Sequence, residues 1–444
     1  MRAVDRAAPE PVEVLVERAG SAVARAALSM LGGSYGRRVV VVAGKGNNGA
    51  DGLVAADRLR RRGVRVHVVD AGDQPDRLPP SDLVIDAAYG TGFRGDYAAP
   101  DPSGAPVLAV DVPSGIDGLT GEAGDGAVRA AATVTFAALK PGLLLGAGFE
   151  HAGRVSVADI GLDVSRSTIS VVEASDVGGW LPDRPRDSHK WKSAIWMVAG
   201  SPGMTGAADM AARAAMRAGA GTVRLGIPGQ PPAPRYPEII GRDLPSEGWD
   251  DDVIAGDLGR MKAAVLGPGL GRSDATAAAV RRLLAKAELP VVVDADALYA
   301  LGSLDDPPRF LRRRPGPTVL TPHDGEFNRL AGCPPGPRRI SAVRHLAFTT
   351  GATVLLKGST TIVADPAGDV LLTTVGDARL ATAGSGDVLA GVIGALLAQG
   401  LDAPRAAAGG AFVHGTAAGL GWKRGLVAGD LLDLLPVVIN QLAP

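Results

Sequence analysis

The distribution of hydrophobic and polar positions predicts alternating strands and helices in the first part of the chain. Short runs rich in valine and isoleucine, bounded by turn residues, are typical of strands buried on both faces of a parallel sheet. The expected strands are RRVVVVAG (37–44), VRVHVVD (64–70), SDLVIDAA (81–88), APVLAVDVP (105–113) and ATVTFAAL (132–139). Helices are expected at 11–28 and at 48–63, the second ending at Gly63. This order predicts a doubly wound α/β layer whose functional loops follow the carboxyl ends of the strands.

A second α/β series follows a turn-rich stretch at residues 175–192. Its expected strands are SAIWMVAG, GTVRLGIP, KAAVLGPG, PVVVDADAL, PTVLTPH and ATVLLKG, with alanine-rich helices such as TGAADMAARAAMRAGA between them. The chain has 444 residues, which is too long for one ordinary core. Because no repeat links the two series, we expect two different α/β domains, at residues 1–170 and 175–444.

The overall composition indicates a globular protein that acts on small molecules. Hydrophobic residues make up 46% of the chain and charged residues 21%, and the formal net charge is −1. This balance offers no basic surface for nucleic acid or anionic lipid, so we expect neither a nucleic-acid nor a membrane partner.

The only cysteine, Cys333, lies in a turn rich in proline and glycine. A disulfide framework and a thiolate metal site within the chain are therefore excluded, and we expect a cytoplasmic location. The first twenty residues carry charges throughout, without the apolar core of a signal peptide, and no uninterrupted apolar run reaches membrane-spanning length.

Polar residues cluster at three of the strand ends predicted in the first domain. The loop AGKGNNGADG contains the G-x-G-x-x-G pattern of dinucleotide-binding loops, but adds two asparagines and an aspartate; the other clusters are Asp86 with YGTGFRG (89–95), and DVPSGIDG (111–118). An ordinary dinucleotide site would place Asp70 on a ribose hydroxyl. Since the carboxyl ends of parallel strands converge on one crevice, the three clusters can share a site.

The residue types in these clusters fit a hard cation and an acid or base. Asn48, Asp86 and Ser114 offer oxygen donors suited to an alkali or alkaline-earth ion, whereas no His/Cys set for zinc is present. Asp111, at the end of an apolar strand, is a candidate acid or base. Each residue taken alone is more often a turn former or a helix cap, so the argument depends on their conjunction.

Four sequence blocks in this half resemble the NAD(P)H-hydrate epimerases: GKGNNGADGLVAA, DAAYGTGFRG, AVDVPSGIDGLTG and TFAALKPGLLLGAG. The resemblance implies a Rossmann-like domain that interconverts the R and S hydrates of NADH or NADPH (NADHX and NADPHX) at C6 of the nicotinamide ring. It also implies potassium bound by Asn48, Asp86 and Ser114. The residues that would contact the hydrate are Asn47, Asn48, Gly49, Ala50, Asp51, Gly90, Thr91, Gly92, Phe93, Arg94, Gly95, Asp96 and Asp111. Ala50 departs from the usual glycine, and its methyl group is tolerated if its φ is negative.

The second domain carries a small-residue loop that opens an apolar helix, ATAGSGDVLAG (381–391). Its backbone N–H groups and the helix dipole form an anion hole, and Asp387 on the first turn is placed to deprotonate a hydroxyl during phosphoryl transfer. The alternative is an ordinary glycine turn in which Asp387 is only a favourable helix-terminal charge. Lys357, in LLKGSTT (355–361), is a candidate phosphate contact. His323 is followed by Asp324 and Glu326 in TPHDGEF, which favours a functional role, although a single histidine is more often structural. The other histidines (His67, His151, His189, His345 and His414) form no constellation and are expected to be structural.

This half lacks a P-loop, and its A-G-S-G-D arrangement is similar to the ribokinase-like superfamily. Five blocks resemble the ADP-dependent NAD(P)H-hydrate dehydratases: GSPGMTGAA, LGPGLG, TPHDGEF, LLKGSTT and ATAGSGDVLAG. The hydrate contacts implied are Ala207, Gly269, His323 and Asp387, and the nucleotide contacts implied are Lys357, Gly358, Ser359, Thr360, Thr361 and Gly386. SHKWKSAIW departs from the usual HKG pattern after His189.

The dehydratase resemblance also implies a mechanism. Asp387 takes the proton of the C6 hydroxyl, the hydroxyl accepts a phosphoryl group from ADP, and phosphate leaves as the ring nitrogen donates electrons. A divalent cation, Mg²⁺, would bridge the nucleotide phosphates. The choice of ADP over ATP comes from the resemblance alone.

The resulting hypothesis is a bifunctional cofactor-repair enzyme in which the epimerase supplies the S hydrate to the dehydratase, and we expect a homo-oligomer. One alternative is a ribokinase-like kinase of a small vitamin precursor fused to a Rossmann-like binding module. A third interpretation treats one domain as a degenerate, non-catalytic binding module. It is based on the departures from the family patterns at Ala50 and in the KWKSA loop.

Overall fold

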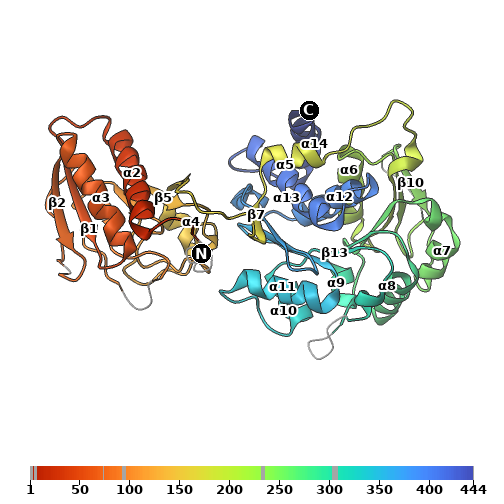
Figure 1. Cartoon of the computed structure of the whole chain (residues 1–444). Coiled ribbons are helices and arrows are strands. Elements are labelled where there is room, and N and C mark those ends of the chain that lie inside the picture. Colours follow the sequence, from red (N-terminus) through yellow and green to blue (C-terminus); the bar gives the residue numbers. More distant parts are fainter. Residues whose placement is uncertain are drawn as a thin grey trace. The chain divides into compact units, whose positions relative to one another are not determined.

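The chain forms two compact units in a computed structural model, residues Met1–Ser167 and Thr168–Pro444 (Figure 1). The structure describes Val4 and residues 8–73, 75–92, 97–231, 236–302 and 309–443. Each unit has a sheet of mainly parallel strands with helices packed against it, so the predicted α/β class is confirmed.

The first unit is built on a six-stranded parallel sheet in the order β2-β1-β3-β4-β5-β6. Its strands are β1 (Arg38–Ala43), β2 (Arg65–Asp70), β3 (Leu83–Ala87), β4 (Val107–Val110), β5 (Ala132–Phe136) and β6 (Arg154–Ala158). The first five coincide with the predicted runs. The edge strand β6 escaped prediction because its sequence, RVSVA, is short, half exposed and has no continuous apolar run.

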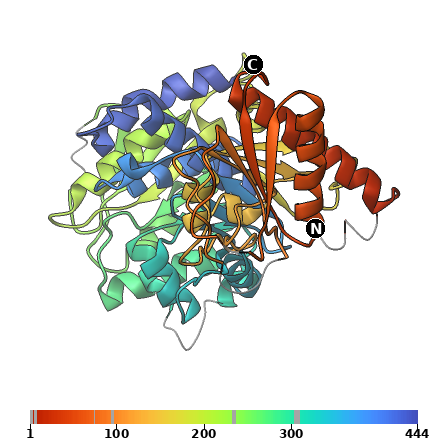
Figure 2. The same cartoon turned by 90° about the vertical axis from the view of Figure 1, so that its left-hand side faces the viewer.

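The helices of the first unit are α2 (Val12–Leu31), α3 (Asn47–Arg61), α4 (Gly146–Ala152) and the 3₁₀ turn η1 (Pro141–Leu143). Helices α2 and α3 lie on one side of the sheet, where they share a core with alternate residues of β1 and β3 (Figure 2). Small residues make this close packing possible: a methyl group at Gly20 would reach Val54 of α3, and one at Gly52 would overlap the side chain of Ala87. The amino end of α3 is thereby fixed beside the carboxyl ends of the strands.

The second unit contains a ten-stranded sheet in the order β10-β9-β8-β11-β12-β13-β14-β15-β16-β7. Its strands are β7 (Ile169–Val171), β8 (Ala194–Val198), β9 (Thr222–Gly226), β10 (Ile239–Arg242), β11 (Ala263–Leu266), β12 (Val291–Val293), β13 (Thr318–Leu320), β14 (Thr353–Leu356), β15 (Thr361–Ala364) and β16 (Val370–Thr373). Strands β10 to β14 are parallel along this order, and β15 is antiparallel to both β14 and β16. The six predicted strands are β8, β9 and β11 to β14; the hairpin and the two edge strands were not predicted.

Ten α-helices of the described residues surround this sheet. They are α5 (Ala174–Trp180), α6 (Thr205–Arg217), α7 (Trp249–Ala255), α8 (Asp274–Lys286), α9 (Asp296–Ala300), α10 (Asp324–Ala331), α11 (Arg339–Thr350), α12 (Ser385–Ala398), α13 (Ala403–Leu420) and α14 (Ala428–Leu442). The short 3₁₀ turns are η2 (Lys190–Ser193), η3 (Asp257–Arg260), η4 (Arg309–Arg313) and η5 (Ala378–Leu380). The prediction of turns from residue 175 is wrong for the first six residues, because a capping box between Glu173 and Asp176 starts α5 and buried Val177 anchors it. In the part of the chain that the structure describes, no helix is both long and apolar enough to cross a membrane.

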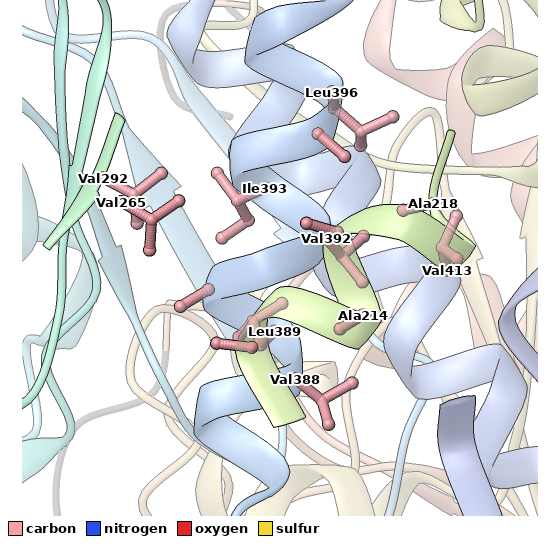
Figure 3. Close-up of a cluster of buried hydrophobic side chains, with 14 of the residues drawn as sticks. Ala214, Ala218, Val265, Val292, Val388, Leu389, Val392, Ile393, Leu396 and Val413 are labelled. Carbon is pink, nitrogen blue, oxygen red and sulfur yellow. The ribbon is translucent and has the colours of Figure 1, made fainter. Parts of the chain in front are cut away.

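Helix α12 forms the centre of the second unit's core (Figure 3). Ile393 points toward Val265 and Val292 of the sheet, while Val392 lies on the opposite side of the helix, toward Val413 of α13. Each fully buried aliphatic side chain of this kind stabilises the fold by about 1.5–3 kcal/mol. Apolar contacts on all sides therefore hold the helix, and its amino end, in a fixed place.

Two candidate active sites

In the first unit, the glycine loop between β1 and α3 is pressed against the chain that leaves β3. A methyl group at Gly44 would overlap the carbonyl oxygen of Ala88, and one at Gly49 would overlap the carbonyl oxygen of Gly44. Neither residue has a positive φ, so backbone conformation does not explain the glycines. They are required because a larger residue would prevent the close approach of the two backbone segments. The loop brings the first turn of α3 next to the ends of β3 and β4.

Asp86 and Ser114 meet at this edge of the sheet. The Ser114 hydroxyl donates to Asp86 Oδ1 at 2.6 Å, and the Ser114 backbone N–H donates to Oδ2 at 2.8 Å. Burial raises the pKa of Asp86 to about 6, against the opposing effect of these hydrogen bonds. The Ser114 hydroxyl oxygen also accepts from the Tyr89 N–H at 2.9 Å.

Asn48 reaches the same region from α3. A methyl group on Gly90 would lie 3.3 Å from Asn48 Oδ1, and Asn48 Nδ2 is buried without a hydrogen-bond partner among the described residues. The three predicted cation ligands thus converge from three segments, with one carboxylate among neutral oxygens. No cluster of three or more His, Cys, Asp or Glu side chains suited to a metal occurs in the described ranges.

A second polar group lies at the end of β4. Asp111 Oδ1 is 2.6 Å from Lys140 Nζ, and it accepts a hydrogen bond from Thr135 Oγ1 at 3.1 Å. Asp111 has φ +67°, a conformation that non-glycine residues adopt at a cost, and Lys140 is only 4% exposed. Asp51, buried on α3, faces this pair: burial and the charge of Asp111 raise the pKa of Asp51 to about 8. At neutral pH a protonated carboxyl therefore stands beside a buried ion pair.

The remaining predicted residues of the first unit lie partly inside and partly outside the described ranges. Thr91 contacts the chain near Gly118, where an added methyl group would lie 2.9 Å from its Cγ2. Phe93, Arg94, Gly95 and Asp96 lie outside the described residues. Ala50 is in the first turn of α3, where its N–H donates to Gly46, and its φ is not positive; its methyl group is therefore compatible with the backbone.

The second site also assembles at the carboxyl ends of parallel strands. Lys357, after β14, places Nζ 2.6 Å from Oδ1 of Asp294, which follows β12. The Thr321 hydroxyl, after β13, donates to the same oxygen at 2.7 Å. Burial lowers the pKa of Lys357, but the charges of Asp294 and Glu326 outweigh it and the net shift is upward. The ammonium group is thus held charged at the sheet edge.

Asp296 has different partners although it is only two residues beyond Asp294. Its carboxylate accepts from Arg272 Nε at 2.7 Å and from the Gly271 N–H at 2.9 Å. Between the two aspartates, Ala295 adopts φ +48°, a strained conformation for alanine. This backbone turn allows two adjacent carboxylates to serve separate cations.

Asp387 occupies the first turn of α12, as predicted. The helix begins after Gly384, which has φ +88° and abuts the Met210 side chain. Burial and the charges of Asp294 and Asp296 raise the pKa of Asp387 to about 6, while Lys357 opposes the shift. A methyl group on Gly386 would lie 3.4 Å from Lys357 Nζ, so the lysine adjoins the amino end of the helix.

The other predicted contacts surround this centre. His323 caps α10, because its Nδ1 accepts from the N–H groups of Gly325 and Glu326 at 3.0 and 3.3 Å. The proton of a neutral ring is then on Nε2, which lies 3.5 Å from Glu326 Oε1. Ala207 and Gly269 lie against each other, within 3.0 Å of a methyl group added at the glycine. The predicted nucleotide loop, residues 357–361, forms the turn between β14 and β15, in which Gly358 and Ser359 are exposed.

Comparison with known proteins finds a different family model for each of the two units. Residues 12–78 and 69–142 match the family model of the YjeF-related protein N-terminus, and residues 195–439 match that of NAD(P)H-hydrate dehydratase. The bifunctional NAD(P)H-hydrate repair enzyme of Mycobacterium tuberculosis is 42% identical over 416 residues, covering 87% of this chain and 84% of the relative. That of Moorella thermoacetica is 36% identical and covers 97% of this chain and 93% of its own length.

The chain belongs to the family of bifunctional NAD(P)H-hydrate repair enzymes. Both resemblances predicted from the sequence blocks are thereby confirmed. Among solved structures, the ADP/ATP-dependent NAD(P)H-hydrate dehydratase of Bacillus subtilis, crystallised with ATP and Mg²⁺, aligns with a TM-score of 0.53 and 30% identity over 61% of this chain and 97% of its own. A ribokinase-like superfamily protein of Enterococcus faecalis shares the fold, with a TM-score of 0.55 and 21% identity over 63% of this chain and 99% of its own.

Two polar residues of this repair enzyme's sites were missed in the sequence. Lys140 directly follows an apolar strand and precedes a proline, and Asp294 ends a run of three valines. A charged residue at the end of a buried run is the signal that would have found both. Neither has a partner nearby in sequence, so only the fold shows that each belongs to an ion pair.

The departure at the KWKSA loop lies away from the second site. The loop forms η2 immediately before β8, at the amino end of the strand, whereas Asp387 and Lys357 gather where the parallel strands finish. Trp191 stacks there under the guanidinium of Arg260, whose carbon lies 3.9 Å from the centre of the Trp191 ring.

His414 is buried on α13. Burial lowers the pKa of His414 to about 4, although a hydrogen bond with the Ser385 backbone acts in the opposite direction. The histidine is therefore neutral, and this hydrogen bond supports the amino end of α12.

Proposed function

We propose that the first unit of this repair enzyme epimerises the R and S hydrates of NADH and NADPH, and that the second unit dehydrates the S form. One observation carries the proposal: each unit gathers a buried aspartate–lysine pair and a third carboxyl of raised pKa at its strand ends. The membership in the bifunctional repair family supports it. The same features favour repair over the kinase alternative, which gives the first unit no chemistry.

The first site suits exchange of the C6 hydroxyl through acid–base catalysis. The ring nitrogen next to C6 stabilises a positive charge there, so protonating the hydroxyl lets it leave as water. Asp51 is protonated at neutral pH and is the proton donor that we propose. Water returns to either face of the ring, giving both epimers. The Asp111–Lys140 pair orients it and accepts its proton, which then passes to Asp51 and restores the acid.

Potassium is the cation that we propose for the oxygen cradle of Asn48, Asp86 and Ser114. The donor set fits, because one carboxylate among neutral oxygens suits a monovalent ion. The bound ion would supply fixed positive charge that orders the loop around Gly90.

The second site suits activation of the same hydroxyl as a phosphate ester. Asp387 takes the hydroxyl proton, and the oxygen bonds to the terminal phosphorus of ADP as the bond to AMP breaks. Phosphate then leaves C6 with its bonding electrons, the ring nitrogen donates electrons, and loss of a proton from C5 restores the dihydronicotinamide. Lys357 and the N–H groups at the amino end of α12 stabilise the charge on the transferring group.

The nucleotide contacts proposed are residues 357–361 with Gly386, and the hydrate contacts are Ala207, Gly269 and His323. Mg²⁺ would supply charge neutralisation between the nucleotide phosphates. Because the described residues contain no ready cluster of three acidic or histidine ligands, the phosphates themselves would hold most of the ion's coordination. A homo-oligomer and a cytoplasmic location are further predictions, to be checked by light scattering and by fractionation.

The direct test is an incubation of the purified chain with mixed R and S NADH hydrate in the presence of ADP, ATP or no nucleotide. Complete ADP-dependent recovery of dihydronicotinamide absorbance is expected. Recovery that stops once the S form is consumed would remove the epimerase proposal. Absence of recovery with either nucleotide would overturn the dehydratase proposal as well.

A further inference from the structure

A cavity of about 240 Å³ lies beside the second site. Its walls include Arg272, Leu298, Tyr299, His323, Glu326 and Arg329. None of the proposed nucleotide contacts lines it, whereas His323 belongs both to this cavity and to the proposed hydrate contacts. The cavity is too small for a whole dinucleotide, but it suits a phosphate-bearing part of one.

The cavity carries an unpaired cation. The guanidinium of Arg329 lies 3.5 Å from the ring centre of Tyr299, and Arg272 lies 5.2 Å from the same ring. Arg272 is neutralised by Asp296 at 2.7 Å. Arg329, in contrast, has no ion-pair partner within the described ranges, and its Nε is buried without a hydrogen-bond acceptor. A guanidinium that lines a cavity without an ion-pair partner has donors left for an anionic ligand.

The cavity also adjoins the reacting groups. Glu326 lines the cavity, and its charge acts on Lys357, which is itself paired with Asp294. A hydrate whose ring contacts His323 and Asp387 must place its pyrophosphate and second nucleoside beyond the ring. The cavity offers that space, and none of residues 357–361 lines it.

We propose that this cavity binds a phosphate group of the dinucleotide hydrate, with Arg329 as its recognition residue. The planar guanidinium matches a phosphate in geometry, and stacking on Tyr299 holds it in orientation. Arg329 is therefore a specificity residue for the substrate and takes no part in the proton transfers. This inference rests on the proposed dehydratase function.

The test compares wild type with Arg329→Met, which keeps a long apolar stem over Tyr299 and removes the donors. KM for both S-NADHX and S-NADPHX is expected to rise at least about tenfold, with kcat and KM for ADP within twofold of wild type. The matched control is Arg338→Met, which removes an exposed arginine outside the cavity and is expected to change neither KM. Equilibrium binding of the product NADPH to the intact chain, expected to weaken by a similar factor, provides a readout independent of turnover.

Comparing the two substrates shows which phosphate group Arg329 contacts. Equal effects on both hydrates identify the pyrophosphate, and an effect on S-NADPHX alone identifies the additional ribose phosphate; either supports the proposal. Unchanged KM and NADPH binding, or a rise confined to KM for ADP, would overturn it. An inactive wild type would instead refute the dehydratase function. If Arg329→Met unfolds, Arg329→Lys replaces it in the test. The same constants are then expected to rise by a smaller factor, because a single ammonium charge replaces the planar guanidinium.

Discussion

The two candidate sites share one arrangement of charged residues, to which we assign opposite tasks. In both units an aspartate at a strand end lies 2.6 Å from a lysine, and a third carboxyl comes from the first turns of a helix that follows a glycine loop. Asp51 in the first unit has a pKa of about 8, so at neutral pH it holds a proton to give; Asp387 in the second has a pKa of about 6 and is ready to take one. Burial dominates both shifts, and the lysine's opposing effect on Asp387 is one source of the difference. The same arrangement thus suits an acid in the first unit and a base in the second, because Asp51 and Asp387 lie in different surroundings.

Asp387→Asn should separate the two activities most strongly. We expect kcat for dehydration to fall by about 10²–10⁴, the usual worth of a general base, while epimerisation continues unchanged. Asp111→Asn should give the converse, with epimerisation lost and dehydration of pure S hydrate retained. Chiral separation of the hydrates and absorbance at the dihydronicotinamide band measure the two steps. A normal dehydration rate in the first variant would exclude Asp387 as the base.

Lys140→Met tests the buried pair of the first unit through stability. The lysine side chain is 5% exposed and Asp111 14%, so removing the lysine leaves a largely buried carboxylate without its partner. The expected loss is about 3–5 kcal/mol in the free energy of unfolding of the first unit. Denaturant unfolding of the full chain would show it as an earlier first transition. Arg62→Met, an exposed charge of the same unit, is the control, and equal midpoints for the two variants would contradict the prediction.

The pH dependence of dehydration sharpens the contrast between acid and base. The rate at saturating substrate should fall as pH drops through about 6, because protonated Asp387 cannot accept the hydroxyl proton. Asp294→Asn removes a negative charge that raises this pKa, so the acid limb should move to lower pH. An unmoved limb, or one moved upward, would show that another group controls it.

Ala50→Gly should have the smallest effect. The methyl group is compatible with helical φ, so glycine gains no backbone freedom that the site needs and weakens α3 by about 0.5–1 kcal/mol. Epimerase KM should stay within twofold of wild type. A marked drop in KM would mean that the methyl group obstructs the substrate, as the interpretation of a degenerate binding module requires.

The sequence predicts the fold better than the chemistry of the sites. Continuous apolar runs identify the central parallel strands, since burial on both faces leaves no polar alternation. The edge strand β6 was missed because it is half exposed and has no continuous apolar run, whereas β15 and β16 are mostly buried but have only four residues each. Asp387 was placed correctly on its helix, but its pairing environment depends on Asp294, which lies more than ninety residues away in sequence.

The same limit applies to individual residues. His323 was considered either structural or functional, and the structure gives its Nδ1 a capping role while its Nε2 lies 3.5 Å from Glu326 Oε1. Asp51 was expected only as a substrate contact, because its raised pKa arises from burial and from Asp111, neither visible in the local sequence. Long-range electrostatics, rather than local pattern, decides which of several aspartates acts as an acid.

The burial of α12 has a consequence for motion. Its backbone amides are enclosed by α6, α13 and the sheet, so their hydrogen exchange should require the opening of the whole unit. Asp387 is attached to this segment and should keep its position during turnover. The turn at Gly358 and Ser359 is exposed, so its amides should exchange much faster. We therefore expect the turn, and not the proposed base Asp387, to move when the nucleotide enters and leaves.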